Sequence, residues 1–149
     1  MEIPTNIAAI IKDIETLKIQ GATAVAQSCF EGIRLYLEEH SGTPERIELF
    51  LSEIEKIGLQ LVHARPNEPL ARNGLKFLLN TYRIRYPGEQ DPVRVKEHLL
   101  KVMDEFLAML ERAKKNIVEV GVNKFSGTNG VLTHCHSSTV EHMCTGMHE

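Results

Sequence analysis

The chain has 149 residues, 25% of them charged, and a formal net charge of -3, so it is long enough for about one domain with its own hydrophobic core. Charges of both signs are interspersed and form no basic stripe, which argues against nucleic-acid binding. No run of residues is long and apolar enough to cross a membrane, and the N-terminus lacks the pattern of a signal peptide.

Apolar residues at helical spacing predict helices over the first four fifths of the chain. The first helix begins behind Thr5 or Asn6 as N-cap, and the chain breaks at Gln20 and Gly21. The second helix ends at residues 41–44, where a threonine caps the third helix and a proline opens it. The expected inward positions of these three helices are Ile7, Ile10, Ile11, Ile14, Leu17, Ala22, Ala26, Cys29, Phe30, Ile33, Leu37, Ile47, Phe50, Leu51, Ile54 and Leu61.

Prolines mark the next two helices. Pro66 forces Arg65 into an extended conformation, so a break separates the third helix from the fourth. Asp91 and Pro92 cap the longest helix, which we expect to end near Gly121. Its apolar stripe has no sustained heptad pattern, which favours a helical bundle over a coiled coil, and its length suggests that it bridges two bodies. The inward positions of these two helices are Leu70, Phe77, Leu78, Tyr82, Val95, Leu99, Val102, Met103, Phe106, Leu110 and Ile117.

A short apolar run from Val131 to His134 follows a turn-rich stretch and predicts a strand that ends at Cys135. Open α/β sheets bind their ligands at that end of a strand. Because a parallel sheet needs several strand–helix units, only the start of such a domain fits here. We therefore expect a mainly α chain, with a helical bundle domain and a long bridging helix over residues 1–122. A linker and the first strand of a truncated α/β domain follow over residues 123–149, where the tail is either disordered or packed back onto the helices.

Two stretches of the helical part have features typical of phosphate binding. In Gln20-Gly21-Ala22-Thr23, small residues at a helix start let backbone N–H groups approach an anion, which the helix dipole favours. Arg65, held extended by the proline after it, could clamp a phosphate with two hydrogen bonds. The alternatives are an ordinary turn between helices and a solvated loop arginine. Taken alone, each stretch is explained more simply by its alternative.

The third candidate site is the stretch around Cys135. A cysteine at a strand-to-helix turn can become a thiolate when a helix N-terminus or a cation lowers its pKa, and it can then act as a base or a nucleophile. Ser137, Ser138 and the backbone N–H groups of the following turn could bind phosphate. The alternative is a buried strand cysteine that behaves as a small hydrophobic residue, next to His134 as a hydrogen-bonded core histidine.

The chain has three cysteines, Cys29, Cys135 and Cys144, and reduced thiols in a cytoplasm are the simplest expectation. Histidines and cysteines are dense near the C-terminus, which raises the question of a metal site. Their spacing contains no paired C-x-x-C and no second ligand pair upstream. We therefore expect no metal ligands.

These three stretches resemble one family, the sugar-phosphate isomerases related to the alpha, beta and delta subunits of translation initiation factor 2B. Within it, the chain is most similar to the archaeal ribose-1,5-bisphosphate isomerases. The matching stretches are Gly21-Ala22, Arg65-Pro66 and residues 130–140, of which the last is the most specific. The sister group of methylthioribose-1-phosphate isomerases usually has asparagine in place of His136, and the regulatory factor subunits usually lack the cysteine. The resemblance covers roughly residues 5 to 140.

The resemblance implies an N-terminal helical domain that a long helix joins to a Rossmann-like domain. It implies the conversion of ribose 1,5-bisphosphate to ribulose 1,5-bisphosphate in nucleotide (AMP) salvage, with Cys135 as the proton acceptor. It further implies that Gly21-Ala22 and Arg65 contact the phosphorylated sugar and that Ser137-Ser138 lie near it. No metal or redox cofactor is required, and an AMP-type activator is a feature of archaeal members.

Two departures from that family stand out. The family commonly has arginine where this chain has Gln20, and losing that charge should weaken phosphate binding. The aspartate that donates a proton lies in the family's C-terminal domain, so we expect an N-terminal portion that is inactive alone. Its partner would be a separate C-terminal half or another copy in a homo-oligomer. One alternative is a non-catalytic regulatory or interaction subunit like those of the translation factor, which Cys135 argues against and the truncation favours. Another is a free-standing helical module without a ligand.

Overall fold

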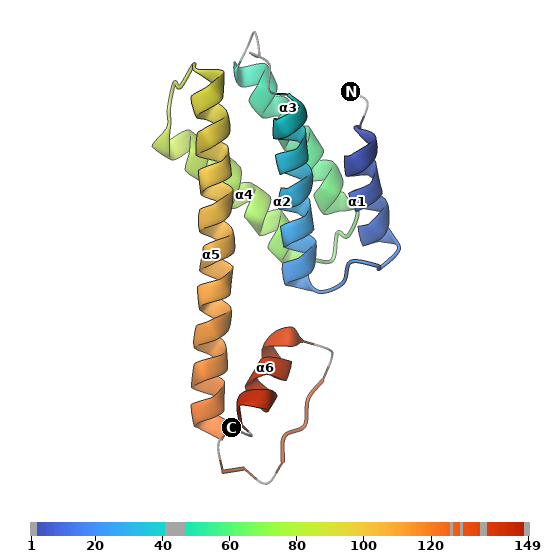
Figure 1. The fold of residues 1–149 in the computed structure, drawn as a ribbon, viewed down its shortest axis with the longest axis vertical. Coiled ribbons are helices and arrows are strands. Elements are labelled where there is room, and N and C mark those ends of the chain that lie inside the picture. Colours follow the sequence, from blue (N-terminus) through green and yellow to red (C-terminus); the bar gives the residue numbers. More distant parts are fainter. Residues whose placement is uncertain (1–2, 41–46, 126, 129, 135–136, 148–149) are drawn as a thin grey trace. The chain divides into compact units, whose positions relative to one another are not determined.

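The computed structural model describes residues 3–40, 47–125, 127–128, 130–134 and 137–147, and these residues form six helices and no strand (Figure 1). The mainly helical fold that the sequence predicts is therefore confirmed. The chain divides within the longest helix into two compact units, Met1–Phe106 and Leu107–Glu149. Among the described residues, no helix is both long and apolar enough to cross a membrane. The helices are α1 (Thr5–Glu15), α2 (Ala22–Glu39), α3 (Ile47–His63), α4 (Pro69–Arg85), α5 (Pro92–Phe125) and α6 (Ser138–Gly146).

Helix α2 is the central helix of the first unit, because it packs against α1, α3 and α4. All of the inward positions predicted for it beyond its first turn are buried. A fully buried Leu, Ile or Phe side chain contributes about 1.5–3 kcal/mol relative to an exposed one, so this shared core holds the unit together. The largest fully buried side chains of the core are Phe30, Ile7, Ile14, Ile33, Leu37, Ile54, Ile57, Leu61, Leu78, Leu99, Met103 and Val25.

The start of α1 differs from the prediction. Its N-cap is Pro4 rather than Thr5 or Asn6. The Asn6 side chain contacts two helices, since its carbonyl oxygen accepts a 2.8 Å hydrogen bond from the backbone N–H of Ile7 in α1 and its amide donates a 2.6 Å hydrogen bond to the Glu39 carboxylate at the end of α2. The predicted cap of α3 falls on residues 41–44, which lie outside the described residues.

Two glycines let the helices of the bundle approach closely. A β-carbon at Gly32 of α2 would lie 2.7 Å from Leu61 Cδ1 of α3. In the same way, a β-carbon at Gly58 of α3 would lie 2.5 Å from Leu75 Cδ1 of α4. Both leucines are buried, so each fills the space that a larger residue on the neighbouring helix would need. These contacts set the spacing between the backbones of α2, α3 and α4.

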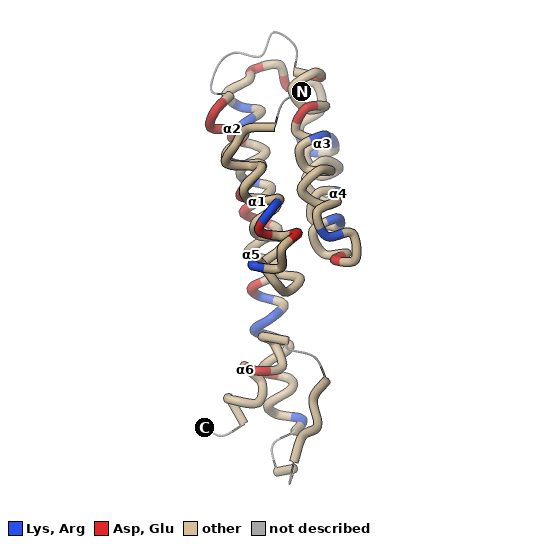
Figure 2. The backbone as a smooth tube through the Cα atoms, turned by 90° about the vertical axis from the view of Figure 1, so that its right-hand side faces the viewer, with Lys and Arg blue, Asp and Glu red and all other residues tan. Residues whose placement is uncertain are grey.

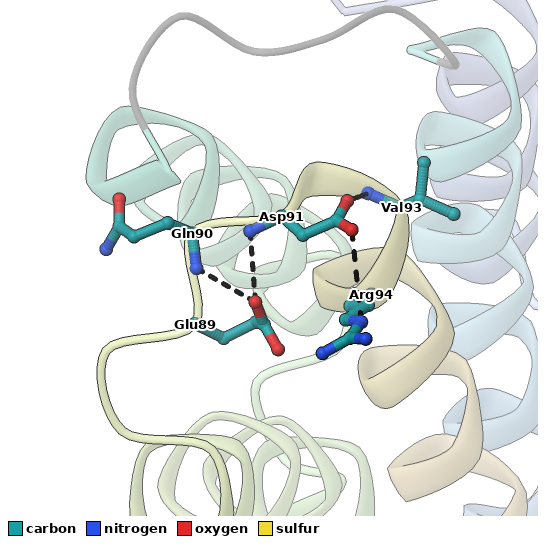
Figure 3. Close-up of polar contacts among 5 residues, drawn as sticks. All are labelled: Glu89, Gln90, Asp91, Val93 and Arg94. Carbon is teal, nitrogen blue, oxygen red and sulfur yellow. Dashed lines mark hydrogen bonds and ion pairs between the residues drawn. The ribbon is translucent and has the colours of Figure 1, made fainter.

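Helix α5 begins with the cap that the sequence predicts (Figure 3). The Asp91 carboxylate accepts a 3.0 Å hydrogen bond from the backbone N–H of Val93, and it lies 3.9 Å from the Arg94 guanidinium. The Glu89 carboxylate in turn accepts 3.0 Å bonds from the backbone N–H groups of Gln90 and Asp91. Side-chain oxygens therefore already bond the backbone N–H groups of Gln90 and Asp91 before the helix and that of Val93 in its first turn.

The first part of α5 belongs to the core of the first unit. The Phe106 ring lies 5.4 Å from the Phe30 ring of α2 and 5.2 Å from the Phe77 ring of α4, measured between centroids. Gly74 of α4 lies under these rings, because a β-carbon there would be 3.0 Å from Phe106 Cε1 and 3.3 Å from Phe30 Cζ. The buried residues of this part are Val95, Leu99, Val102, Met103 and Phe106, all of which the periodicity predicts as inward.

In the second unit, α5 continues to Phe125 instead of ending near Gly121. Gly121 is a buried residue within the helix, and a β-carbon there would lie 2.7 Å from Met143 Cγ of α6. The glycine therefore serves helix packing and does not end the helix. A β-carbon at Gly146 of α6 would likewise lie 3.0 Å from Val122 Cγ2. In each of the two helices, a side chain therefore packs directly against a glycine of the other helix.

The C-terminal segment differs from the prediction in its secondary structure. Residues 130–134 form no strand, because a strand exists only when its N–H and C=O groups pair with a neighbouring strand, and the described residues contain none. The residues after Val140 form part of α6, which runs from Ser138 to Gly146. Of the two expectations for the tail, packing back onto the helices is confirmed by the contacts of Met143 and Gly146 with α5.

Candidate functional site

The start of α2 is the first predicted phosphate-binding stretch. Its N-cap is Gly21, with φ of 87°, a conformation that side chains with a β-carbon rarely adopt. Among the described residues no side chain caps this helix, and its first turn contains no acidic residue. The first N–H groups of an α-helix have no acceptor within the helix, so those of Ala22 and Thr23 stay available to an anion, which the helix dipole attracts. The start of α5 differs, because there the Asp91 carboxylate already accepts a hydrogen bond from a backbone N–H of the first turn.

Gln20, also predicted to bind substrate, is an exposed residue in the turn between α1 and α2. Its side-chain amide donates a 2.7 Å hydrogen bond to the backbone carbonyl of Leu17. In this arrangement the carboxamide contacts the turn that precedes Gly21.

Arg65 is the second predicted phosphate-binding residue, and it lies in the connection between α3 and α4 where the sequence predicts a break. Its side chain is 28% exposed, and its Nε lies 3.4 Å from the Glu68 carboxylate. Its Nη1 is buried and has no hydrogen-bond partner among the described residues. A buried donor without a partner costs about 1–3 kcal/mol, so an acceptor that reached Nη1 would recover free energy of this order.

The fold brings these two stretches to the same end of the first unit. Helix α2 begins and α3 ends at this end, because the two helices run in opposite directions (Figure 1). The open helix start at Gly21 and the guanidinium of Arg65 therefore both belong to one end of the bundle. Lysine and arginine are interspersed with aspartate and glutamate along the helices (Figure 2).

The third predicted stretch lies in the second unit. Ser137 is the N-cap of α6 and Ser138 is its first residue, and both are exposed. The Ser138 carbonyl accepts a contact of 2.5 Å from His142 Nδ1. Glu141 lies in the first turn of the helix, where its charge competes with an anion for the helix dipole. Cys135, the predicted proton acceptor, lies outside the described residues.

A cavity of about 460 Å³ lies within the second unit, next to this stretch. Carbon-rich side chains from α5, the irregular segment and α6 line most of it, with hydroxyl groups and an imidazole among them. The lining residues are Phe125, Thr128, Gly130, Val131, Leu132, Thr133, His134, Val140 and Met143. Its volume is in the range of small-molecule sites in proteins.

The other thiols differ from one another in environment. Cys29 is buried in the core of the first unit, and burial raises the pKa of its thiol to about 12, so it stays protonated and unreactive. Cys144 on α6 is half-buried. Within the part of the chain that the structure describes, no three His, Cys, Asp or Glu residues gather as metal ligands would.

Two residues of this site escape reasoning from the sequence. Glu68 pairs with Arg65, and its position three residues later could have indicated the pair. Leu17 has a positive φ of 61°, and nothing in the sequence marks a leucine for that conformation, which glycine or asparagine usually adopts.

Comparisons with known proteins bear on the whole chain. Relatives named ribose 1,5-bisphosphate isomerase include those of Thermococcus kodakarensis, 24% identical over 137 residues, and Haloferax volcanii, 27% identical over 126 residues. A third, from Pyrococcus furiosus, is 26% identical over 129 residues. The matches cover 92%, 85% and 86% of this chain but 42%, 37% and 39% of those proteins, so the chain spans about two fifths of their length. Residues 18–149 match the Initiation factor 2 subunit family, and because that match covers most of the chain, the chain belongs to this family.

Proposed function

We propose that this chain supplies the helical side of a sugar-phosphate isomerase site that converts ribose 1,5-bisphosphate to ribulose 1,5-bisphosphate. The names of the relatives support the substrate and the reaction. The observation that carries the proposal is the open start of α2 at the same end of the bundle as Arg65, whose Nη1 has no partner among the described residues. A substrate with two phosphate groups needs several donors of this kind.

In the proposed reaction, a proton leaves one carbon of the sugar and another proton returns to the neighbouring carbon. We assign Cys135 as the proton acceptor, as the resemblance implies. Gly21, Ala22 and Thr23 would bind a phosphate through backbone N–H groups, and Arg65 would bind it through its guanidinium. We assign Ser137-Ser138 as contacts of the sugar phosphate, again as the resemblance implies. Nothing in this reaction requires a metal or a redox cofactor.

The proposal extends to the whole protein. In it, residues 131–134 pair with a further strand and become the first strand of a Rossmann-like domain, with the domain boundary at residues 122–123. Such pairing would satisfy the backbone groups that form no strand in the structure. The 149 residues by themselves would then bind phosphate without turning over ribose 1,5-bisphosphate, with a C-terminal half or a second copy as the missing partner.

The binding part of the proposal can be tested on this chain with a titration of inorganic phosphate, followed by the amide resonances of Ala22 and Thr23. We expect these resonances to shift, and Arg65→Gln to weaken binding about tenfold, because a hydrogen bond to a charged group contributes about 1.5–3 kcal/mol. Arg83→Gln is the matched control, since Arg83 is an arginine of α4 that pairs with Glu55. Equal affinities of the two variants would contradict the role of Arg65.

The second candidate function is a non-catalytic subunit that binds a partner, which the description of the family as initiation factor subunits supports. The two functions differ at Cys135. In the whole protein, Cys135→Ser should abolish turnover of ribose 1,5-bisphosphate if the chain belongs to an isomerase. A wild-type protein without turnover, whose partner binding is unchanged by the same substitution, would favour the second function.

A further inference from the structure

The turn between α1 and α2 contains a backbone conformation that needs support. Leu17 has a φ of 61°, which is unfavourable for a residue with a β-carbon because that carbon crowds the following carbonyl oxygen. The Leu17 side chain is 50% exposed, so burial of its side chain offsets little of this strain. Other contacts of the turn must therefore hold the conformation.

Three of these contacts belong to the end of α1. The Leu17 N–H donates to the Ile14 carbonyl at 3.2 Å, and the Ile19 N–H donates to the Asp13 carbonyl at 3.1 Å. The Lys18 ammonium lies 2.8 Å from the Asp13 carboxylate, but both side chains are well exposed, at 70% and 38%. Exposed ion pairs of this kind contribute little.

The remaining contact comes from Gln20. Its Nε2 donates to the Leu17 carbonyl at 2.7 Å, the shortest of the four contacts. This bond closes a small ring over residues 17–20, directly before Gly21, the N-cap of α2. The direction of the first N–H groups of α2 follows from the backbone conformation at Gly21, which the ring immediately precedes.

We propose that Gln20 is a positioning residue. Its carboxamide holds the Leu17 carbonyl and thereby orients the open start of α2 toward a bound phosphate. This inference rests on the proposed phosphate site and gives Gln20 an indirect role in place of the direct substrate contact predicted from the sequence.

The test compares Gln20→Met with the wild type in the 149-residue chain. Methionine is similar in length and uncharged, but it cannot donate a hydrogen bond. We expect amide hydrogen exchange in residues 19–21 to become about fivefold faster, and the affinity of the α2 start for inorganic phosphate to fall about fivefold, since a neutral hydrogen bond corresponds to a factor of this order. Gln90→Met is the matched control, because Gln90 also precedes a helix start and its carboxamide points away from the cap (Figure 3).

A second background separates positioning from direct contact. Glycine adopts a positive φ without steric cost, so in a Leu17→Gly chain the turn needs Gln20 less. There we expect Gln20→Met to change phosphate affinity less than twofold. The same fivefold loss in both backgrounds would indicate direct contact and overturn the inference, as would unchanged exchange and affinity in Gln20→Met. If the wild type binds no phosphate at the α2 start, the proposed site fails, and the exchange rates of residues 19–21 still decide whether Gln20 holds the turn.

Discussion

Replacing Gly74 by alanine tests how closely α4 approaches the aromatic rings of α2 and α5. In an open helix position, this change stabilises a protein by about 1 kcal/mol, because alanine has the higher helix propensity. At Gly74 the new β-carbon would lie 3.0 Å from Phe106 Cε1 and 3.3 Å from Phe30 Cζ. The two rings are buried and lie 5.4 Å apart, so neither can swing aside freely. Overpacking of a core costs about 1–3 kcal/mol, and we therefore expect a net destabilisation of up to about 2 kcal/mol.

The assay is urea unfolding followed by tyrosine fluorescence. The chain has no tryptophan and three tyrosines, and these tyrosines, at positions 36, 82 and 86, all lie in the first unit, so the signal reports on that unit alone. Asn73→Ala is the control, because Asn73 is the exposed neighbour of Gly74 on α4. This control should stabilise the unit by up to about 0.7 kcal/mol through helix propensity.

A third variant checks the cause. Phe106→Leu removes the ring that lies nearest to Gly74, so the cost of Gly74→Ala should shrink when both changes are combined, with a coupling of at least about 0.5 kcal/mol. Stabilisation of the unit by Gly74→Ala alone, to the same extent as by Asn73→Ala, would refute the close approach of α4 to the rings. Strict additivity of Gly74→Ala and Phe106→Leu would show that the cost arises elsewhere.

Three further outcomes are expected. Burial raises the pKa of Cys29 from 9.0 to about 12, so the unfolded state loses its thiol proton first and stability falls between these pH values by up to about 1.4 kcal/mol per pH unit. In urea unfolding at pH 8 to 10, Cys29→Ala should therefore reduce the fall of the free energy of unfolding with pH. Identical pH dependences of the variant and the wild type would contradict this. Tyr36→Phe removes the 2.8 Å hydrogen bond to Glu53 and should cost about 1 kcal/mol in the same assay, whereas an unchanged midpoint would show that the bond contributes nothing. Gly121→Leu should displace α6 from α5 and speed its amide exchange, and unchanged exchange of α6 would argue against the packing described.

The parts of the fold that the sequence predicts are those determined by local chemistry. The break at Arg65-Pro66 follows from proline stereochemistry, and the cap at Asp91 follows from a side chain that bonds its own neighbours. Gly121 is different, because whether a glycine ends a helix or receives a side chain depends on a residue far along the chain. The strand predicted from Val131 fails to form for a related reason, since strand pairing is never local.

The same distinction applies to the candidate site. The types of residue at Gly21 and Arg65 suggest anion binding from the sequence alone. Their placement at one end of the bundle requires the antiparallel packing of α2 and α3, which no local pattern contains. The role of Gln20 depends on a hydrogen bond within a strained turn, and the periodicity of apolar residues carries no information about that bond.

The uncapped start of α2 also has a consequence for how this protein can change in evolution. An acidic residue in the first turn of a helix stabilises it by about 0.3–1 kcal/mol, and α2 lacks one there. A variant such as Thr23→Glu would therefore be favoured by selection for stability alone. The same carboxylate would interact with the positive end of the helix dipole and repel a phosphate, so selection for phosphate binding would remove the substitution. If the proposed function holds, selection for phosphate binding keeps α2 less stable than an acidic first turn would make it. Relatives with an acidic residue at this helix start should then be those that no longer bind the phosphate.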